Sequence, residues 1–380
     1  MDLKEYREQL DQIDNGLIDL FARRMEIAAH IAEYKKNNGL PVLDGKRERE
    51  KLLDVFEKSP EGVKEYAVSL YSLIFELSRS SQNRLLGLTT ELTRQIGNAI
   101  ENTPRLFPEN AIVACQGVEG AYSQLACDKL FKLPNVFYFS SFDAVFSAVD
   151  KGLCRYGVIP LENSTAGSVN KVYDLMMQHD FRIVRSVRLK VDHNLLANPG
   201  VELADIKEIY SHEQAISQCA GYLQKLTGVK VIPCENTAVA AKMVKESGRK
   251  DVAALSSRPC AKLYGLQCLD EAVQDQGNNY TRFICISKNL EIYPGADRTT
   301  LMMTLPHRPG SLCQALSRFY SLGINIIKLE SRPIPERDFQ FMFYFDLGTS
   351  VYSEEFGRMI NDLDAISEEF RYLGSYSEVI

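Results

Sequence analysis

A hydrophobic repeat over residues 3–34 most constrains what this chain can fold into. Apolar side chains recur there in alternating steps of three and four, which is the pattern of one face of an α-helix. A helix of about 32 residues is about 48 Å long, so its apolar face can be covered only by another long helix. Shorter helical repeats follow near residues 45–57 and over residues 63–97. Residues 1–97 are therefore predicted to form an all-helical module that pairs with a second copy.

The composition is that of a soluble protein with more than one domain. The 380 residues are 45% hydrophobic and 25% charged, and the net charge of −6 argues against a general nucleic-acid binder. The chain has no apolar run near the ~20 residues of a membrane helix and no signal peptide pattern. Nine cysteines without a C-x-x-C pair are typical of reduced thiols rather than a metal site. We expect a cytoplasmic protein that acts on small molecules.

A linker and two further segments follow the helical module. Residues 98–110 contain two prolines and are predicted to be a linker. Strand-like and helical stretches alternate over residues 111–290, which predicts an α/β domain. Residues 298–376 repeat the alternation in miniature as strand, helix, strand, strand, helix, strand, the pattern of an α+β ferredoxin-like unit.

The helical module carries cations at unexpected positions. Arg24 occupies an apolar position of the first repeat, which is costly unless the cation is paired or meets an anionic ligand. Lys35 lies on the same helix face about 16 Å away, so the two side chains could hold a small dianion between them. Arg7 lies about 25 Å from Arg24 on another face and could join that pocket only from a neighbouring chain. Each feature alone is also compatible with a paired core charge or a solvated surface.

In order and spacing, these residues resemble the binding residues of the all-helical chorismate mutases over roughly residues 1–90. The resemblance implies a substrate site made of Arg7, Arg24, Lys35, Asp44, Arg47, Glu48, Ser78 and Gln82. It implies that Arg24, Lys35 and the partner subunit's Arg7 hold the substrate carboxylates. Lys35 and Gln82 would bind the ether oxygen, and Glu48 the ring hydroxyl. The rearrangement of chorismate to prephenate transfers no proton, so a pocket of cations and amides suffices.

Polar clusters lie where strands of the α/β segment end. They are the turn at residues 117–120, residues 162–165, residues 211–214 and the hexamer "NNYTRF" at residues 278–283. Ligands of α/β sheets bind at the carboxyl ends of strands, although each cluster alone could also be a helix cap or a turn.

Three of these clusters resemble the Glu-Asn-Ser/Thr, Ser-His-x-Gln and Thr-Arg-Phe motifs of prephenate dehydratase, whereas the turn "GVEG" departs from that family's Gly-Pro-x-Gly. The resemblance implies a two-lobed fold like that of periplasmic binding proteins, with the site in the cleft and no metal or organic cofactor. The implied substrate-binding residues are Glu162, Asn163, Ser164, Ser211, His212, Gln214, Arg282 and Phe283. Thr281 would be catalytic, donating a hydrogen bond to the departing hydroxyl, directly or through a relay. Arg282 would hold a carboxylate or brace the site.

Residues 305–316 and 325–335 of the last segment resemble the phenylalanine-binding motifs Gly-Ala-Leu-Val and Glu-Ser-Arg-Pro of an ACT regulatory domain, although the first motif departs here as Gly310-Ser311-Leu312-Cys313. The implied effector residues are Gly310, Ser311, Leu312, Glu330, Ser331 and Arg332. The whole chain thus resembles the bifunctional chorismate mutase–prephenate dehydratases of phenylalanine biosynthesis. That family implies chorismate and prephenate as substrates, phenylalanine as allosteric inhibitor, and a homodimer or higher oligomer, without nucleic acid or membrane. Two alternatives stay open: a two-lobed small-molecule sensor with an ACT domain and a helical dimerisation segment, and a dehydratase that prefers arogenate.

Overall fold

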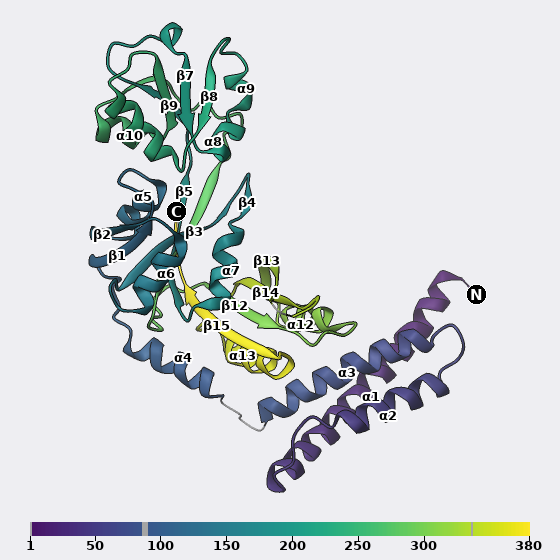
Figure 1. Cartoon of the computed structure of the whole chain (residues 1–380). Coiled ribbons are helices and arrows are strands. Elements are labelled where there is room, and N and C mark those ends of the chain that lie inside the picture. Colours follow the sequence, from purple (N-terminus) through teal and green to yellow (C-terminus); the bar gives the residue numbers. More distant parts are fainter. Residues whose placement is uncertain (1, 86–89, 336) are drawn as a thin grey trace. The chain divides into compact units, whose positions relative to one another are not determined.

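The computed structural model describes residues 2–85, 90–335 and 337–380 (Figure 1). The chain divides into two compact units. The first unit comprises Met1–Arg94 and Gly357–Ala365, and the second comprises Gln95–Phe356 and Ile366–Ile380. No helix of the described residues combines the length and the apolar character needed to cross a membrane.

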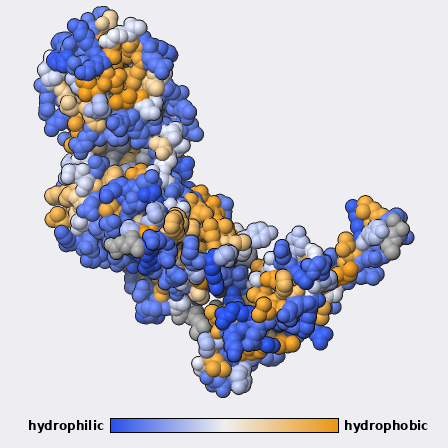
Figure 2. Space-filling view, turned by 45° about the vertical axis from the view of Figure 1, so that its right-hand side comes forward, coloured by the Kyte–Doolittle hydropathy of each residue, from blue (hydrophilic) through white to orange (hydrophobic). Residues whose placement is uncertain are grey.

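Long helices make up most of the first unit. They are α1 (Leu3–Asn37), α2 (Gly45–Lys58) and α3 (Lys64–Leu85), and α1 and α2 both pack against α3. The Asp2 side chain and Glu5 form a capping box that begins α1. The predicted all-helical module is confirmed for these residues. Much of the apolar repeat of α1 is uncovered within the chain, with Leu10 57% and Leu17 55% exposed, and hydrophobic side chains line the surface of this unit (Figure 2).

The segment after α3 differs from the prediction of one helical stretch over residues 63–97. α3 ends at Leu85, and a separate helix α4 (Glu91–Asn102) follows. Residues 98–102, predicted as the start of the linker, are therefore helical. Helix α4 extends into the predicted linker because Ile96 and Ala99 are buried on one of its faces. The first proline of the predicted linker comes only at residue 104. The Phe107 ring then packs against the rings of Phe131 and Tyr293, at 5.1 and 4.9 Å between centroids.

The second unit contains the expected pair of α/β lobes. The first lobe is a sheet in the order β16-β5-β11-β3-β1-β2, with β4 paired to β3. Its strands are β1 (Asn110–Gln116), β2 (Leu133–Phe139), β3 (Tyr156–Asn163), β4 (Gly167–Ser168), β5 (Arg182–Lys190), β11 (Tyr280–Ser287) and β16 (Glu378–Val379). Its helices are α5 (Tyr122–Leu130), α6 (Phe142–Asp150) and α7 (Asn170–Gln178). β11 enters the sheet antiparallel to both β3 and β5.

The second lobe is a sheet in the order β10-β6-β9-β7-β8. Its strands are β6 (Asn194–Ala197), β7 (Glu208–Ser211), β8 (Lys230–Pro233), β9 (Val252–Ser256) and β10 (Gln267–Asp270). Its helices are α8 (Glu213–Gln218), α9 (Ala220–Leu223), α10 (Thr237–Ser247) and α11 (Arg258–Tyr264). The chain crosses between the lobes after β5 and returns before β11, and β11 carries the predicted site residues Thr281, Arg282 and Phe283.

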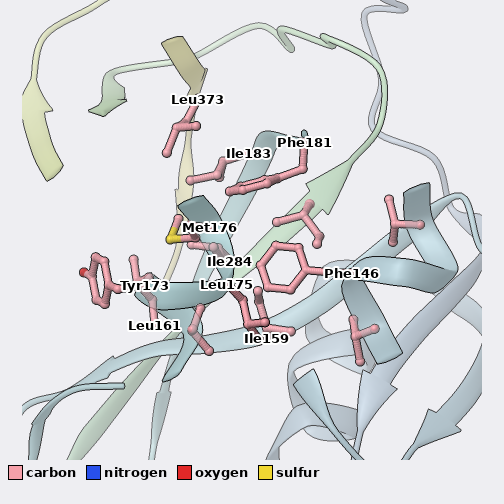
Figure 3. Close-up of a cluster of buried hydrophobic side chains, with 14 of the residues drawn as sticks. Phe146, Ile159, Leu161, Tyr173, Leu175, Met176, Phe181, Ile183, Ile284 and Leu373 are labelled. Atoms are coloured by element: carbon pink, nitrogen blue, oxygen red, sulfur yellow. The ribbon is translucent and has the colours of Figure 1, made fainter. Parts of the chain in front are cut away.

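A third sheet has the order β13-β14-β12-β15, which is the ferredoxin-like order predicted for residues 298–376. Its elements are β12 (Arg298–Thr304), α12 (Ser311–Ser321), β13 (Asn325–Pro333), β14 (Phe341–Gly348), α13 (Glu354–Ile366) and β15 (Glu369–Tyr376). The chain then supplies β16 to the sheet of the first lobe. One hydrophobic cluster joins the two sheets, and Figure 3 shows Leu373 of β15 beside Ile183 of β5 and Met176 of α7.

Candidate active sites

A pocket of about 370 Å³ lies among α1, α2 and α3 of the first unit. That volume falls in the range of small-molecule sites. Its lining consists of Arg24, Ile27, Ala28, Ile31, Lys35, Val42, Asp44, Arg47, Glu48, Phe75, Ser78, Arg79 and Gln82. The pocket therefore brings together every residue predicted for this module except Arg7. Arg7 lies on the exposed part of α1, well before Arg24 along the helix.

The Arg24 cation of this pocket has unused hydrogen-bonding capacity. The Arg24 guanidinium lies 5.4 Å from the centre of the Phe75 ring, and its buried Nη1 has no partner among the described residues. Lys35 Nζ donates a hydrogen bond to the Val42 carbonyl oxygen at 2.6 Å, which bends the lysine toward the same cavity. A partly buried cation with a free donor in a pocket favours an anionic ligand.

Helices α2 and α3 contribute a charged pair and an amide to the pocket. Arg79 of α3 forms an ion pair with Glu48 of α2. Gln82 Nε2 donates to Ser78 Oγ at 3.1 Å, while the buried Gln82 Oε1 has no partner among the described residues. Sequence reasoning missed Arg79, whose single signal was its place in the polar run at residues 78–82. Its pairing holds Glu48 at the pocket wall.

A second pocket, of about 350 Å³, lies where the chain crosses between the two lobes. It is lined by Thr165, Ala166, Gln214, Ser217, Gln218, Gln274, Asp275, Gln276 and Asn279. These residues come from the turn after β3, from helix α8 and from the crossing that leads into β11. None of them is a lysine or an arginine, so the polar groups on this wall are mainly amides and hydroxyls.

Asn163 forms hydrogen bonds both to Thr281 and to Asn279, which lines this second pocket. Asn163 and Thr281 face each other across the β3–β11 pair, and Asn163 Nδ2 donates to Thr281 Oγ1 at 2.9 Å and to Asn279 Oδ1 at 2.8 Å. The other end of the amide is fixed, because Asn163 Oδ1 accepts from the Thr165 backbone N–H at 3.0 Å. Since Thr281 Oγ1 accepts a hydrogen bond from Asn163, its own proton is free to bind another acceptor. The Asn163 amide thus orients Thr281, whereas we predicted that it would bind the substrate.

Sequence reasoning did not single out Gln218, which connects the two lobes at the pocket. Gln218 Nε2 of α8 donates to Thr165 Oγ1 of the first lobe at 2.7 Å, and Gln218 Oε1 accepts from Asn279 Nδ2 at 3.0 Å. His193 Nε2 lies 2.9 Å from the same oxygen and must therefore carry the proton. Burial lowers the pKa of His193, which favours the neutral ring. The available signal was the i,i+4 spacing of Gln214 and Gln218 on one helix face.

Several predicted substrate contacts have structural positions instead. Ser211 is fully buried and its Oγ donates to the Leu255 carbonyl at 2.8 Å, while Phe283 packs in the core of the first lobe. His212 caps α8, with Nδ1 accepting from the Gln214 N–H at 3.2 Å. Ser164 Oγ accepts from the Tyr280 N–H at 2.9 Å and so braces the hexamer. In this arrangement Gln214 is the member of the group that lines the pocket.

The glycine turn at residues 117–120 packs against the second lobe. A Cβ atom on Gly120 would lie 2.9 Å from Leu263 Cδ2, and Gly120 has φ of +88°, so glycine is required there for space and conformation. Tyr264 OH donates to the Glu119 carbonyl at 2.8 Å. The turn therefore holds α11 against α5 at the junction of the lobes.

Glu162 and Arg282 lie side by side on β3 and β11 and face the third sheet. Arg282 is 4% exposed and forms an ion pair with Asp346 of β14. Lys328 of β13 lies 2.5 Å from the Glu162 carboxylate. Neither Glu162 nor Arg282 lines the described pocket. Of the two predicted roles of Arg282, its placement supports bracing the site, and the predicted contact of Glu162 with substrate has no support from its position.

The predicted effector residues divide between two faces of the third sheet. Glu330 pairs with Ser168, and Arg332 forms a bidentate ion pair with Asp174 at 2.8 and 3.0 Å, so both face the first lobe. Ser331, between them, is exposed on the opposite face. Gly310 has φ of +88° and precedes α12. The Ser311 Oγ that follows is buried without a partner among the described residues, and Leu312 is half-buried.

Comparisons with known proteins cover both pockets. The family model of chorismate mutase type II matches residues 6–83, and that of prephenate dehydratase matches residues 113–291. A bifunctional chorismate mutase/prephenate dehydratase of Escherichia coli is 31% identical over 379 residues, covering 97% of this chain and 95% of that protein. An arogenate dehydratase/prephenate dehydratase of Arabidopsis thaliana is 37% identical over 296 residues, covering 75% of this chain and 76% of that protein. Prephenate dehydratase of Arthrobacter aurescens, solved in complex with L-Phe, has a TM-score of 0.65 and 28% identity over 70% of this chain and 89% of its own.

Proposed function

The chain belongs to the family of bifunctional chorismate mutase/prephenate dehydratases, and we propose that it catalyses both reactions in turn. The helical unit converts chorismate to prephenate, and the two-lobed domain converts prephenate to phenylpyruvate in phenylalanine biosynthesis. The observation that carries this proposal is the helical pocket, where Arg24, Lys35, Glu48 and Gln82 meet. A helical segment that served only for dimerisation would not need an unpaired cation in its apolar repeat, which argues against the sensor alternative.

The mutase step requires the pocket to hold a folded dianion and to stabilise charge on its ether oxygen. Arg24 and Lys35 would bind the carboxylates, and Lys35 and Gln82 would donate to the ether oxygen as its bond breaks. Glu48, held by Arg79, would accept from the ring hydroxyl. No bond to the protein forms, so the gain comes from positioning and from preorganised donors.

The exposed apolar face of α1 supports a dimer in which the sites are shared. Leu10, Leu17 and their neighbours on that face are uncovered within one chain, and a second copy offers a matching long helix. Arg7 lies on the same half of α1 and would reach the pocket of the partner subunit. The mutase site would then have cations from two chains.

The dehydratase step removes the ring hydroxyl and the ring carboxylate together. The C–CO₂ bond breaks, its electron pair completes the aromatic ring, and the departing hydroxide takes up a proton from solvent and leaves as water. Thr281 would donate the hydrogen bond that stabilises the departing oxygen, because Asn163 occupies the threonine's acceptor side. Gln214 and the other amides of the pocket would bind the substrate's oxygens.

The test is to add chorismate to the purified chain without added cofactor. We expect prephenate to form first and then phenylpyruvate, with one CO₂ released per phenylpyruvate. Prephenate that accumulates without phenylpyruvate would remove the dehydratase assignment. Chorismate that stays unchanged, while added prephenate is consumed, would remove the mutase assignment.

A dehydratase that prefers arogenate is the second candidate, favoured by the similarity to the Arabidopsis thaliana protein. Arogenate carries an ammonium group where prephenate has a ketone, and Asp275 is the acidic residue on the pocket wall. Comparing kcat/KM for the two substrates on one preparation decides between them. A ratio above one for prephenate supports the main proposal.

Feedback inhibition by phenylalanine through the third sheet completes the proposal. It is supported by the ferredoxin-like topology and the two motifs, and by the relative solved with L-Phe bound. Gly310 lets the loop before α12 approach a ligand closely. Inhibition requires that phenylalanine bind more tightly to a less active state of the dehydratase.

Glu330→Ala is expected to weaken inhibition by phenylalanine at least about tenfold, the scale of a typical allosteric coupling. The carboxylate lies on the predicted effector strand and contacts Ser168 of the first lobe. Its loss is therefore expected to weaken phenylalanine binding or the coupling of that binding to the dehydratase site. The measurement is titration calorimetry with phenylalanine and tyrosine, combined with dehydratase assays. Glu355→Ala, on the exposed face of α13, is the matched control. Full inhibition of Glu330→Ala, or no phenylalanine binding by the unaltered protein, would contradict the assignment.

A further inference from the structure

The antiparallel pair of β3 and β11 carries two kinds of residues on its two faces. Thr281 pairs in register with Asn163, and Arg282 pairs in register with Glu162. Because successive side chains of a strand point to opposite faces, the hydroxyl and amide lie on one face and the ion pair on the other. Arg282 Nε lies 2.7 Å from Glu162 Oε1, an ionic contact without hydrogen-bond alignment.

The third sheet supplies the main counter-ion of Arg282. Asp346 of β14 pairs with Arg282 Nη2, and its other oxygen accepts from Thr300 Oγ1 at 2.6 Å. Both charged side chains are buried, at 4% and 6% exposure. Arg282 Nη1 has no partner among the described residues. Without Asp346, the buried cation would therefore be balanced by Glu162 alone, and a buried charge that loses its partner forces its surroundings to rearrange.

Glu162, in turn, is held from the third sheet by Lys328. Lys328 Nζ of β13 lies 2.5 Å from Glu162 Oε2 and donates to Ser168 Oγ of β4 at 2.7 Å. β4 pairs with the end of β3, so the lysine fixes the turn that begins at Asn163 and contains Thr165. That turn provides part of the wall of the second pocket.

The third sheet is docked closely enough to hold these positions. Met342 and Leu373 belong to the same buried cluster as Ile159 and Ile284 of the first lobe. Figure 3 labels Leu373, Ile159 and Ile284 of this cluster. A Cβ on Gly374 would lie 2.2 Å from the Ile183 carbonyl oxygen, which shows how near β15 comes to β5. The contact between the two parts is therefore a packed interior rather than a hydrated surface.

We propose that Asp346 and Lys328 are positioning residues of the dehydratase site. They hold Arg282 and Glu162 on the reverse face of the strand pair and thereby fix Thr281 and Asn163 on the front face. This inference rests on the dehydratase function proposed above. It makes the ferredoxin-like domain part of the catalytic scaffold when no phenylalanine is present, because catalytic geometry tolerates displacements of well under 1 Å.

Asp346→Asn and Lys328→Met are each expected to lower dehydratase kcat about tenfold or more, with little change in KM. The mutase rate of the same preparation reports folding and concentration, since that pocket lies in the other unit. Asp346→Glu and Lys328→Arg keep the charges and are expected to recover part of the loss. Asp338→Asn, an exposed acid of the same domain, is the matched control and should behave as the unaltered chain.

A double-mutant cycle separates positioning from a general loss of stability. If Asp346 acts through Thr281, Asp346→Asn added to Thr281→Ala will lower the residual rate by less than twofold. The inference would be overturned if the loss of kcat in the double variant equals the product of the two single losses. It would also be overturned if the single variants keep an unaltered kcat. If Asp346→Asn does not fold, the same double-mutant cycle with Lys328→Met and Thr281→Ala tests whether the third sheet acts through Thr281. An unaltered chain that is inactive on prephenate and arogenate would instead contradict the proposed function.

Discussion

Thr281→Ala lowers dehydratase kcat at least about 100-fold in our expectation, the scale of losing a positioned proton donor. The hydroxyl is held by Asn163 at 2.9 Å with its own proton free, and alanine leaves the departing hydroxide without that donor. The mutase rate should stay unchanged because its pocket lies in the other unit. Both rates are to be measured on one folded preparation.

Thr281→Ser is the matched control for this prediction. Serine keeps the hydroxyl and removes one methyl group, so it should retain most of the activity. Thr281 lies beside the described pocket rather than on its wall, which makes the experiment discriminating. If Thr281→Ala reacts within a few-fold of the unaltered enzyme, the threonine has no part in the chemistry.

Arg7→Ala and Arg24→Ala homodimers should each lose at least about 100-fold in mutase rate, as when one preorganised donor is removed from a site. Arg24 lines the pocket of its own chain, whereas Arg7 would serve the pocket of the partner subunit. A dimer with one variant of each kind then has one intact site and one doubly altered site. We expect about half of the unaltered activity per mixed dimer, measured after purification through two different affinity tags.

Arg23→Ala controls for the loss of a cation from α1, because Arg23 is exposed and lies next to Arg24 outside the pocket. It should leave the mutase rate unchanged. Mixed dimers without activity, made from two folded variants, would show that each site is built within one chain. In that case the exposed face of α1 would need another explanation.

The mutase pocket could be predicted from sequence because its residues break a regular pattern. Arg24 interrupts an apolar repeat, and the helix period then places Lys35 on the same face. α1, α2 and α3 are stiff and local, so spacing along the chain translates directly into position. Arg79 was not predicted as a site residue, because a polar residue within a polar run does not interrupt any hydrophobic pattern.

The dehydratase site was less predictable, since residues of one motif separate to opposite faces of a strand. Thr281 and Arg282 are neighbours in sequence but lie on opposite faces of the strand pair, and only Arg282 contacts the third sheet in this arrangement. Ser211 and Phe283 belong to recognisable motifs and are core residues. Asp346 lies 64 residues from Arg282, and nothing in its local sequence indicates a buried counter-ion. Such pairings depend on how the sheets dock, which is a tertiary property.

The pairing of β16 with β5 has a consequence for how this protein is made. The sheet of the first lobe takes strands from residues 110–190, 280–287 and 378–379. The ribosome must therefore have synthesised residue 379 before that sheet can be complete. Helices α1, α2 and α3 of the helical unit are synthesised first. Long-range pairing of this kind slows folding and leaves strand edges open in the meantime. The open strand edges of the first lobe are therefore exposed from the synthesis of residue 190 until β16 has been made.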